Sequence, residues 1–384
     1  MPRGRAIIMD LVRPELAALP GLDRASGTVE TIAKLDANEN PLTLAPEAAA
    51  DLGRVLSAVP LHRYGDDSTP LLRARLAKSL DVEPAQLCFG NGSNELLRLL
   101  ATVFARPRPD ALRARILFPS PTFFGFKAAA LLAGVEPVEV PLDDAMELDP
   151  AAMHAAIVRT RPNLVFLCRP NNPTGTLWSR RTVMQLVARH PDVLFAIDEV
   201  YQAYAKSTLL YLLETLPNIV IVRSLSKVGG AALRVGYVVA DPEIVAQLER
   251  VRPPFAVSAL NAAAACWLLE RGAKHVASAV SDVIAERDRL TASLAELGLA
   301  VFPSRANFVL MRYLGGAAEL CRRLRERGIL VCDFDRPGPL TGCLRITVGS
   351  RRELDSLLDA IASEIVTLHR EQRSPCTNPS YLPS

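Results

Sequence analysis

Short apolar runs alternate with helical stretches between about residue 70 and residue 250. Four of these runs are rich in β-branched and aromatic residues and are followed by polar or turn residues: Ile116–Phe118, Leu164–Cys168, Val193–Ile197 and Ile219–Val222. Runs that are apolar on both faces are typical of buried parallel strands with helices packed outside them. The pattern therefore predicts an α/β fold whose large domain has a mostly parallel sheet flanked by helices.

The pattern changes near Arg252-Pro253-Pro254. A helical region rich in alanine and leucine follows over residues 258–297, and then short strands alternate with helices: strands near 300–302, 308–311, 329–331 and 344–348, helices near 316–327 and 351–370. This predicts a second, smaller α/β domain. We expect an N-terminal arm over 1–35, a large domain over 36–252, a small C-terminal domain over 253–370 and a disordered tail over 371–384.

Composition is that of an ordinary globular protein. The chain has 384 residues, 49% of them hydrophobic and 22% charged, and its formal net charge is +3. So small a charge gives no reason to expect nucleic acid or a membrane surface as partner, and no apolar run is long enough to cross a bilayer. The first apolar run ends at Asp10, so we expect no signal peptide and a cytoplasmic enzyme. Seven scattered cysteines indicate reduced thiols rather than disulfides or a metal site.

The loop that follows the 219–222 run carries the most informative residue of the chain, Lys227. A desolvated lysine on such a loop is a good amine nucleophile, as Schiff-base formation requires. Ser224, Ser226 and Arg234 on the same loop offer donors for a phosphate group. A solvated loop lysine is the ordinary alternative, and this loop alone does not decide between the two.

Polar residues also follow the other strands, and ligands of open parallel sheets bind at the carboxyl ends of strands. Ser93 and Asn94 precede a helix, where they can cap its first turn and cradle an anion. Phe123, after the 116–118 run, is placed to stack on a planar cofactor. An ordinary capped helix and a core phenylalanine are the alternatives.

Asn172 lies in a proline-rich turn after the 164–168 run, and Asp198 and Tyr201 follow the 193–197 run. A carboxylate at the end of a buried strand is costly unless it meets a cation, and a protonated pyridine nitrogen is such a cation. A plain turn and a helix-capping aspartate are the alternatives for each motif alone. Together with Lys227, these residues outline a site for pyridoxal 5′-phosphate (PLP).

With these motifs the chain resembles the fold-type I PLP-dependent aminotransferases, most closely their histidinol-phosphate aminotransferase branch. The resemblance covers about residues 30–365 and implies a seven-stranded sheet in the large domain. It rests on seven strings: Leu35–Pro41, Arg63–Gly65, Gly90–Glu95, Pro170–Gly175, Asp198–Tyr201, Ser226-Lys227 and Cys343–Gly349.

The resemblance implies a role for each matching residue. Lys227 forms the Schiff base and shuttles the proton, Asp198 pairs with the ring nitrogen, and Phe123 stacks on the ring. Asn172 and Tyr201 contact the ring oxygen. Arg345 binds the substrate carboxylate, and Asn172 also takes part in binding the substrate. The phosphate is held by Ser93, Asn94, Ser224, Ser226 and Arg234, and by Tyr64 of the neighbouring subunit in a homodimer.

The implied reaction moves an amino group from an amine donor to a 2-oxo acid, with histidinol phosphate and 2-oxoglutarate as the first choice. Some positions depart from the branch: Ala18 and Cys332 stand where anion-binding residues are expected, and Arg312 and Arg336 are possible substitutes. The loop between Lys227 and Arg234 is one residue shorter than usual. An aminotransferase for aromatic or other amino acids, a phospho-amino-acid decarboxylase and a PLP-binding transcription regulator remain alternatives.

Overall fold

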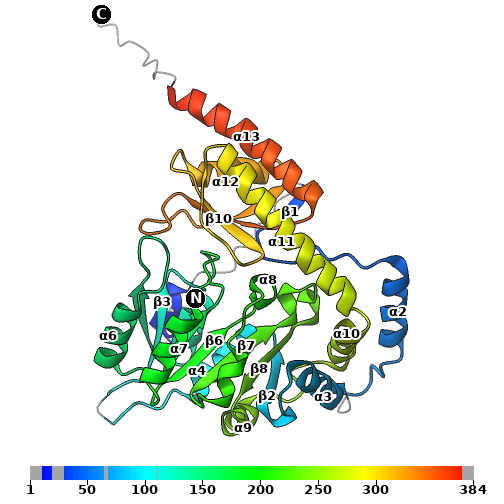
Figure 1. The fold of residues 1–384 in the computed structure, drawn as a ribbon, viewed down its shortest axis with the longest axis vertical. Helices are drawn as coiled ribbons and strands as arrows, with labels where there is room; N and C mark the ends of the chain where they lie inside the picture. The colour runs from blue at the N-terminus through cyan, green and yellow to red at the C-terminus, as the bar shows by residue number, and fades with distance from the viewer. Residues whose placement is uncertain (1–10, 20–29, 65–67, 110, 374–384) are drawn as a thin grey trace, which may run out of the picture.

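The computed structural model describes residues 11–19, 30–64, 68–109 and 111–373. These residues form two α/β units, a larger one around a seven-stranded sheet and a smaller one around a five-stranded sheet (Figure 1). The fold class predicted from the sequence is confirmed. The structure also explains how residues far apart in the chain meet at one edge of the larger sheet.

The larger sheet has the strand order β2-β8-β7-β6-β5-β3-β4, and β8 runs antiparallel to both of its neighbours. The other adjacent pairs are parallel. Its strands are β2 (Leu87–Asn91), β3 (Arg115–Ser120), β4 (Glu136–Pro141), β5 (Leu164–Cys168), β6 (Leu194–Asp198), β7 (Ile219–Ser224) and β8 (Val235–Ala240). In the register, Cys168 pairs with Asp198 and Asp198 with Val222, so β5, β6 and β7 end at the same edge.

Helices cover both faces of this sheet, as the apolar strands require. On β5, Phe166 joins the core on the face covered by α4, α5 and α9, whereas Val165 and Leu167 join the core on the face covered by α3, α6, α7 and α10. The helices of this unit are α2 (Pro46–Ser57), α3 (Ser68–Leu80), α4 (Ser93–Val103), α5 (Gly125–Leu132), α6 (Pro150–Thr160), α7 (Arg180–Arg189), α8 (Gln202–Ala205), α9 (Pro242–Val251) and α10 (Ala259–Glu270).

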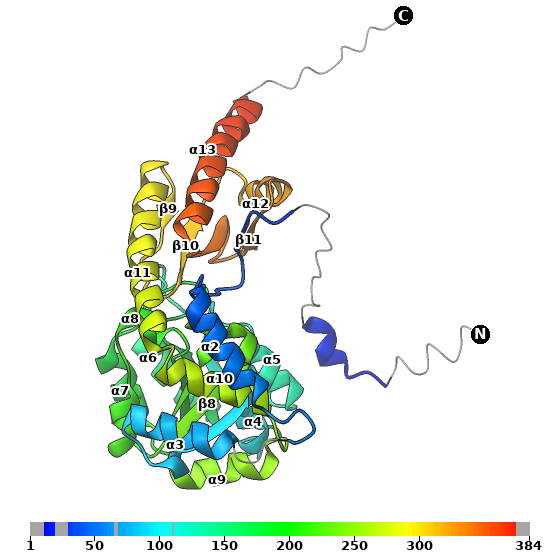
Figure 2. The same cartoon turned by 90° about the vertical axis from the view of Figure 1, so that its right-hand side faces the viewer.

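The smaller sheet has the order β1-β11-β12-β10-β9. Its strands are β1 (Ala33–Leu35), β9 (Ala300–Val301), β10 (Phe308–Arg312), β11 (Ile329–Asp333) and β12 (Cys343–Thr347). Helices α11 (Ala273–Glu296), α12 (Ala317–Glu326) and α13 (Arg351–Arg373) belong to this unit, and α13 projects furthest from the larger sheet (Figure 2).

Two segments lie elsewhere than the expected domain boundaries suggest. Residues 33–35, expected in the N-terminal arm, form β1, which pairs in parallel with β11. Ala33 and Leu35 are buried in this strand, and Lys34 between them is exposed. Helix α10, expected in the small domain, packs on α3 and α2 instead. The helical region over 258–297 is therefore two helices, separated at Arg271-Gly272, of which α10 packs with the larger unit.

The N- and C-terminal regions are described only in part. Residues 14–18 form a short 3-10 helix beside α5, where Arg13 Nη2 donates to the carbonyl of Leu131 at 2.9 Å. Helix α13 extends to Arg373, and the remainder of the expected tail lies outside the described residues. None of the helices in the described ranges combines the length and the apolar composition that a membrane span needs.

Candidate active site

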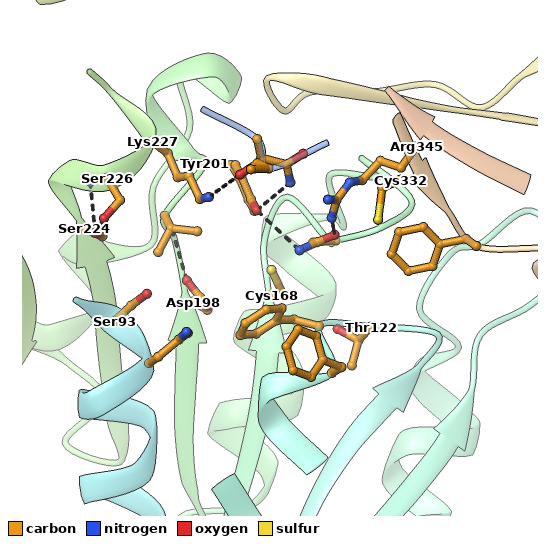
Figure 3. A pocket seen from close by; sticks show the side chains of 18 of the residues that line it. Ser93, Thr122, Cys168, Asp198, Tyr201, Ser224, Ser226, Lys227, Cys332 and Arg345 are labelled. Carbon is orange, nitrogen blue, oxygen red and sulfur yellow. Dashed lines mark hydrogen bonds between the residues drawn. The ribbon is translucent and has the colours of Figure 1, made fainter. Parts of the chain in front are cut away.

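A pocket opens at the carboxyl ends of β5, β6 and β7, and its other wall comes from β11 and β12 of the smaller sheet (Figure 3). All the candidate site residues of the sequence except Tyr64 line it: Ser93, Asn94, Phe123, Asn172, Asp198, Tyr201, Ser224, Ser226, Lys227, Arg234 and Arg345. The structure thus brings together side chains from seven segments of the chain.

Lys227 ends a single 3-10 turn, Leu225–Lys227, that follows β7 directly. Ser224 caps this turn by accepting a hydrogen bond from the Ser226 amide at 3.0 Å, and the Lys227 carbonyl accepts one from the Tyr204 hydroxyl. The amine donates to the carbonyl of Ala37 at 3.1 Å. Burial, together with the nearby Arg345 guanidinium, lowers the pKa of Lys227 to about 8. About a tenth of the amine is therefore uncharged at pH 7, far more than for an ordinary lysine, and the uncharged amine is the nucleophile.

Asp198 is the last residue of β6 and is only 2% exposed. Its carboxylate accepts a hydrogen bond from the Val200 amide at 3.2 Å. Burial raises the pKa of Asp198 to about 7, although this bond and the charge of Lys227 act in the opposite direction. A carboxylate with so little solvation is suited to hold a cation that enters the pocket.

This raised pKa predicts a stability change for the cofactor-free protein. An unfolded aspartate has an ordinary pKa of 3.8, whereas burial raises the pKa of the folded Asp198 to about 7. Ionised Asp198 therefore lowers the stability of the fold increasingly as pH rises between these two values. We expect Asp198→Asn to be more stable than the parent at pH 8 and to lose this advantage by pH 4. Urea unfolding at both pH values measures the difference, and a difference independent of pH would contradict the assignment.

The first turn of α4 forms the floor of the pocket. Gly92, at φ 79°, is the N-cap of this helix, and Ser93 and Asn94 are its first two residues. The sequence-based expectation that Ser93 or Asn94 caps the helix is therefore wrong, because the chain enters the helix through a left-handed residue. Free amides of the first turn and the helix dipole favour an anion here.

Arg234 brings a full positive charge to the same turn. Its Nη1 donates to the Ser226 hydroxyl at 3.2 Å, and Ser226 Oγ lies 2.8 Å from Ser224 Oγ. A Cβ built on Gly92 would lie 2.4 Å from Arg234 Nη2, so the guanidinium lies directly against this glycine. The shortened loop between Lys227 and Arg234 still brings the arginine to the helix N-terminus, with Arg234 itself in a left-handed conformation at φ 50°.

Gly92→Ala is expected to damage this cradle. The substitution adds a side chain at positive φ and a close contact with Arg234, which together cost about 1–3 kcal/mol of unfolding free energy. Denaturant unfolding measures the loss. Gly298→Ala, also at positive φ (79°) but with open space around its Cβ, is the reference substitution without a crowding neighbour. Equal losses for the two variants would show that Arg234 does not crowd Gly92.

The opposite side of the pocket holds Arg345, which is 8% exposed. Its Nη1 donates to Asn172 Oδ1 and its Nη2 to the carbonyl of Asp36, both at 2.7 Å, and the guanidinium lies 5.3 Å from the Phe334 ring centroid. Its Nε is buried and has no hydrogen-bond partner among the described residues. The guanidinium lines the pocket, and a positive charge there suits a carboxylate or phosphate of a substrate.

Several lining residues were given no role from the sequence. Asn38, Thr122, Phe124, Val200 and Phe334 all line the pocket, and the Asn38 amide donates to the Tyr201 hydroxyl at 3.0 Å. Asn38 belongs to the Leu35–Pro41 string, one of those on which the family resemblance rests. The sequence therefore did contain a signal that this residue belongs to the site. Phe123, the expected stacking ring, meets Phe124 and Phe126 edge to face at the pocket wall.

Other candidates lie away from the pocket. Tyr64 is 73% exposed and stacks on Phe255, with ring centroids 4.4 Å apart. Arg312 lies over the Phe302 ring, and Arg336 is largely exposed beside Asp333, so neither replaces the expected anion-binding residue at Cys332, which does line the pocket. Within the described ranges, no three side chains of the metal-ligating kinds come together.

Comparison with known proteins agrees with this geometry. The model of the family "Aminotransferase class I and II" matches residues 30–361. The chain is 39% identical over 360 residues to histidinol-phosphate aminotransferase of Chromobacterium violaceum, covering 92% of this chain and 98% of the relative, and 36% identical over 375 residues to that of Roseiflexus castenholzii, covering 93% and 98%. A solved histidinol-phosphate aminotransferase of Sinorhizobium meliloti in complex with PLP has the same fold, with a TM-score of 0.81, 24% identity and coverage of 94% and 98%.

Proposed function

The chain belongs to the class I and II aminotransferase family, and from this premise we propose that it is a PLP-dependent histidinol-phosphate:2-oxoglutarate aminotransferase. The observation that carries the proposal is the convergence of Lys227, Asp198 and the anion cradle of α4 on one pocket. The names of relatives at 36–39% identity over more than nine tenths of the chain support histidinol phosphate as the amino donor.

The residues of the pocket fit PLP at both of its ends. The crowded Gly92 and the free amides of α4 suit a phosphate, and the poorly solvated Asp198 suits the protonated ring nitrogen. Ser93, Asn94, Ser224, Ser226 and Arg234 would hold the phosphate, Phe123 would stack on the ring, and Asn172 and Tyr201 would contact its oxygen. When bound, PLP supplies an electrophilic carbon and a ring that withdraws electrons from the substrate.

The other functions in the reaction fall to side chains of the protein. Lys227 Nζ would hold the cofactor and would take the proton from the substrate carbon that bears nitrogen. Asp198 would hold the protonated ring nitrogen. Arg345 binds the anionic group of the donor and then that of the 2-oxo acid, which places both substrates in the same orientation.

One observation favours a second candidate, an aminotransferase for aromatic amino acids. The cations that line the pocket in the described chain are Lys227, Arg234 and Arg345, and we assign the first two to the cofactor. Arg345 then serves the substrate, with Phe124, Phe334 and Cys332 around it. One arginine beside aromatic rings suits the carboxylate of phenylalanine as well as the phosphate of histidinol phosphate.

Single-turnover half-reactions separate the two candidates. PLP-loaded protein is mixed with histidinol phosphate or with phenylalanine, and the decay of the visible cofactor band is followed. We expect histidinol phosphate to react at least about tenfold faster, because its imidazole and phosphate use both the rings and Arg345. Faster reaction of phenylalanine would contradict the proposed donor and favour the second candidate.

We also propose a homodimer in which Tyr64 reaches the phosphate site of the neighbouring subunit. Its exposed ring and the stacking partner Phe255 form part of a surface that suits a second copy of the chain. Light scattering should give two chains of 41.6 kDa each. Mixing inactive Lys227→Ala chains with Tyr64→Ala chains should restore activity, since one mixed site is intact; a monomer, or no restoration, would contradict the proposal.

A further inference from the structure

The segment Asp36–Asn40, which we call the bridge segment, connects the two walls of the pocket. It follows β1 of the smaller sheet. Its main chain accepts hydrogen bonds from two site residues. The Asp36 carbonyl accepts from Arg345 Nη2 at 2.7 Å, and the Ala37 carbonyl accepts from Lys227 Nζ at 3.1 Å (Figure 3). The next residue along the chain, Asn38, contacts a third site residue through its side chain.

Asn38 is 2% exposed, and each of its polar atoms makes a hydrogen bond. Its amide N–H donates to Thr347 Oγ1 at 2.9 Å, and its carbonyl accepts from Asn307 Nδ2 at 3.0 Å. Thr347 ends β12, and Asn307 directly precedes β10, so both anchors belong to the smaller sheet. The side-chain amide of Asn38 reaches the larger unit, where Nδ2 donates to Tyr201 Oη at 3.0 Å.

The orientation of the Asn38 amide follows from its neighbours. Thr347 Oγ1 already accepts the Asn38 N–H, and its hydroxyl proton points to Asn38 Oδ1 at 3.3 Å. With Oδ1 on the Thr347 side, the NH₂ group of the amide faces Tyr201. The Thr347 hydroxyl thus supports the orientation in which Asn38 donates to the tyrosine.

The same reasoning applies to Asn172 on the other side of the tyrosine. Arginine can only donate, so Asn172 Oδ1 faces Arg345 Nη1 at 2.7 Å and its Nδ2 faces Tyr201 Oη at 3.4 Å. The Tyr201 oxygen thus accepts from two amides, which uses both of its lone pairs. Its own proton has no acceptor in the part of the chain that the structure describes, and it is left for a group in the pocket.

We infer that Asn38 is a positioning residue that makes the Tyr201 hydroxyl a donor toward the pocket and links it, through Thr347, to the sheet that carries Arg345. The inference rests on the proposed function, in which the acceptor is the ring oxygen of PLP. This role explains why position 38 of the Leu35–Pro41 string is an asparagine. An aspartate there would accept the tyrosine proton instead of donating to the tyrosine oxygen.

The test is a double-mutant cycle read from the cofactor's absorbance rather than from turnover. The PLP-loaded full chain is titrated between pH 5 and pH 10, and the midpoint of the visible band change is recorded for Asn38→Ala, Asn38→Asp, Tyr201→Phe and the two double variants. A lost donor at the ring oxygen leaves the proton on the Lys227 nitrogen more tightly held. We expect Asn38→Ala to raise the midpoint by about half a pH unit, roughly a threefold change in proton affinity, and Asn38→Asp to raise it further.

In the Tyr201→Phe background Asn38→Ala should leave the midpoint unchanged, and Asn38→Asp should keep only the part of its shift that comes from its added charge. Asn40→Ala is the matched control: Asn40 lies in the same segment, but it donates to Tyr204 Oη at 2.9 Å, so any shift it causes should persist without the Tyr201 hydroxyl. Thr347→Val keeps Asn38 but removes the hydroxyl that donates to its Oδ1, so it should raise the midpoint by less than Asn38→Ala does. This variant replaces the Asn38 variants in the test if they do not fold.

Equal shifts with and without the Tyr201 hydroxyl overturn the inference while leaving the proposed function intact, and so does a Thr347→Val midpoint equal to that of the parent. A parent chain that takes up no PLP overturns the proposed function and the inference with it. A shift of Asn38→Ala confined to proteins with Tyr201 supports both.

Discussion

Replacing Lys227 with alanine is expected to lower the transamination rate by at least about 10⁴-fold. The substitution removes both the amine that attaches the cofactor and the base that takes the substrate proton, and a positioned acid–base group alone contributes about 10²- to 10⁴-fold. The protein should still bind PLP non-covalently, because the anion cradle of α4 and Asp198 remain. Steady-state rates at saturating PLP, together with the absorbance of the bound cofactor, measure the two effects separately.

Two controls separate chemistry from charge and from folding. Lys227→Arg keeps a cation in the pocket but is not a nucleophile at neutral pH, so it should be as inactive as the alanine variant. Lys274→Ala removes an exposed lysine of α11 and should keep full activity. Turnover of Lys227→Ala within tenfold of the parent would remove Lys227 from its proposed role.

Replacing Asp198 with alanine is expected to lower kcat/KM by about 10²- to 10³-fold at saturating PLP. Removing one partner of a buried charge pair costs about 3–5 kcal/mol, and here the partner is the protonated ring nitrogen that Asp198 holds. Asp198→Asn should lose a similar factor, since an amide does not keep the ring nitrogen protonated. Asp198→Glu retains the charge on a longer side chain and should recover part of the rate.

The asparagine variant should therefore be more stable at pH 8 yet far less active. A buried carboxylate that binds a cation of the ligand is expected to destabilise the ligand-free fold and to be required for activity. If Asp198→Asn lost stability and activity in proportion at pH 8, Asp198 would serve the fold instead of the cofactor.

The sequence was sufficient to predict the strands that position the site. β5, β6 and β7 are buried on both faces, so their continuous apolar runs stand out, and Asn172, Asp198 and Lys227 follow these runs closely. Because parallel strands end at one edge of a sheet, their order along the chain was enough to expect these side chains together.

The sequence alone did not predict the contacts between distant segments. The Gly92 N-cap depends on a single left-handed residue, and β1 has three residues, too few for a periodic pattern. Asn38 and Thr347 are 309 positions apart, and nothing in either neighbourhood indicates that they meet. Only Arg271-Gly272 separate α10 from α11, so the packing of α10 against α3 is what shows to which unit it belongs.

Borohydride reduction identifies the amine that holds the cofactor. The PLP-loaded protein is reduced, digested and examined by mass spectrometry, with and without prior incubation with histidinol phosphate. We expect one phosphopyridoxyl group per chain, on Lys227 and on none of the other five lysines, and we expect it to disappear after incubation with the donor. Label on another lysine, or label at Lys227 that histidinol phosphate does not remove, would contradict this expectation.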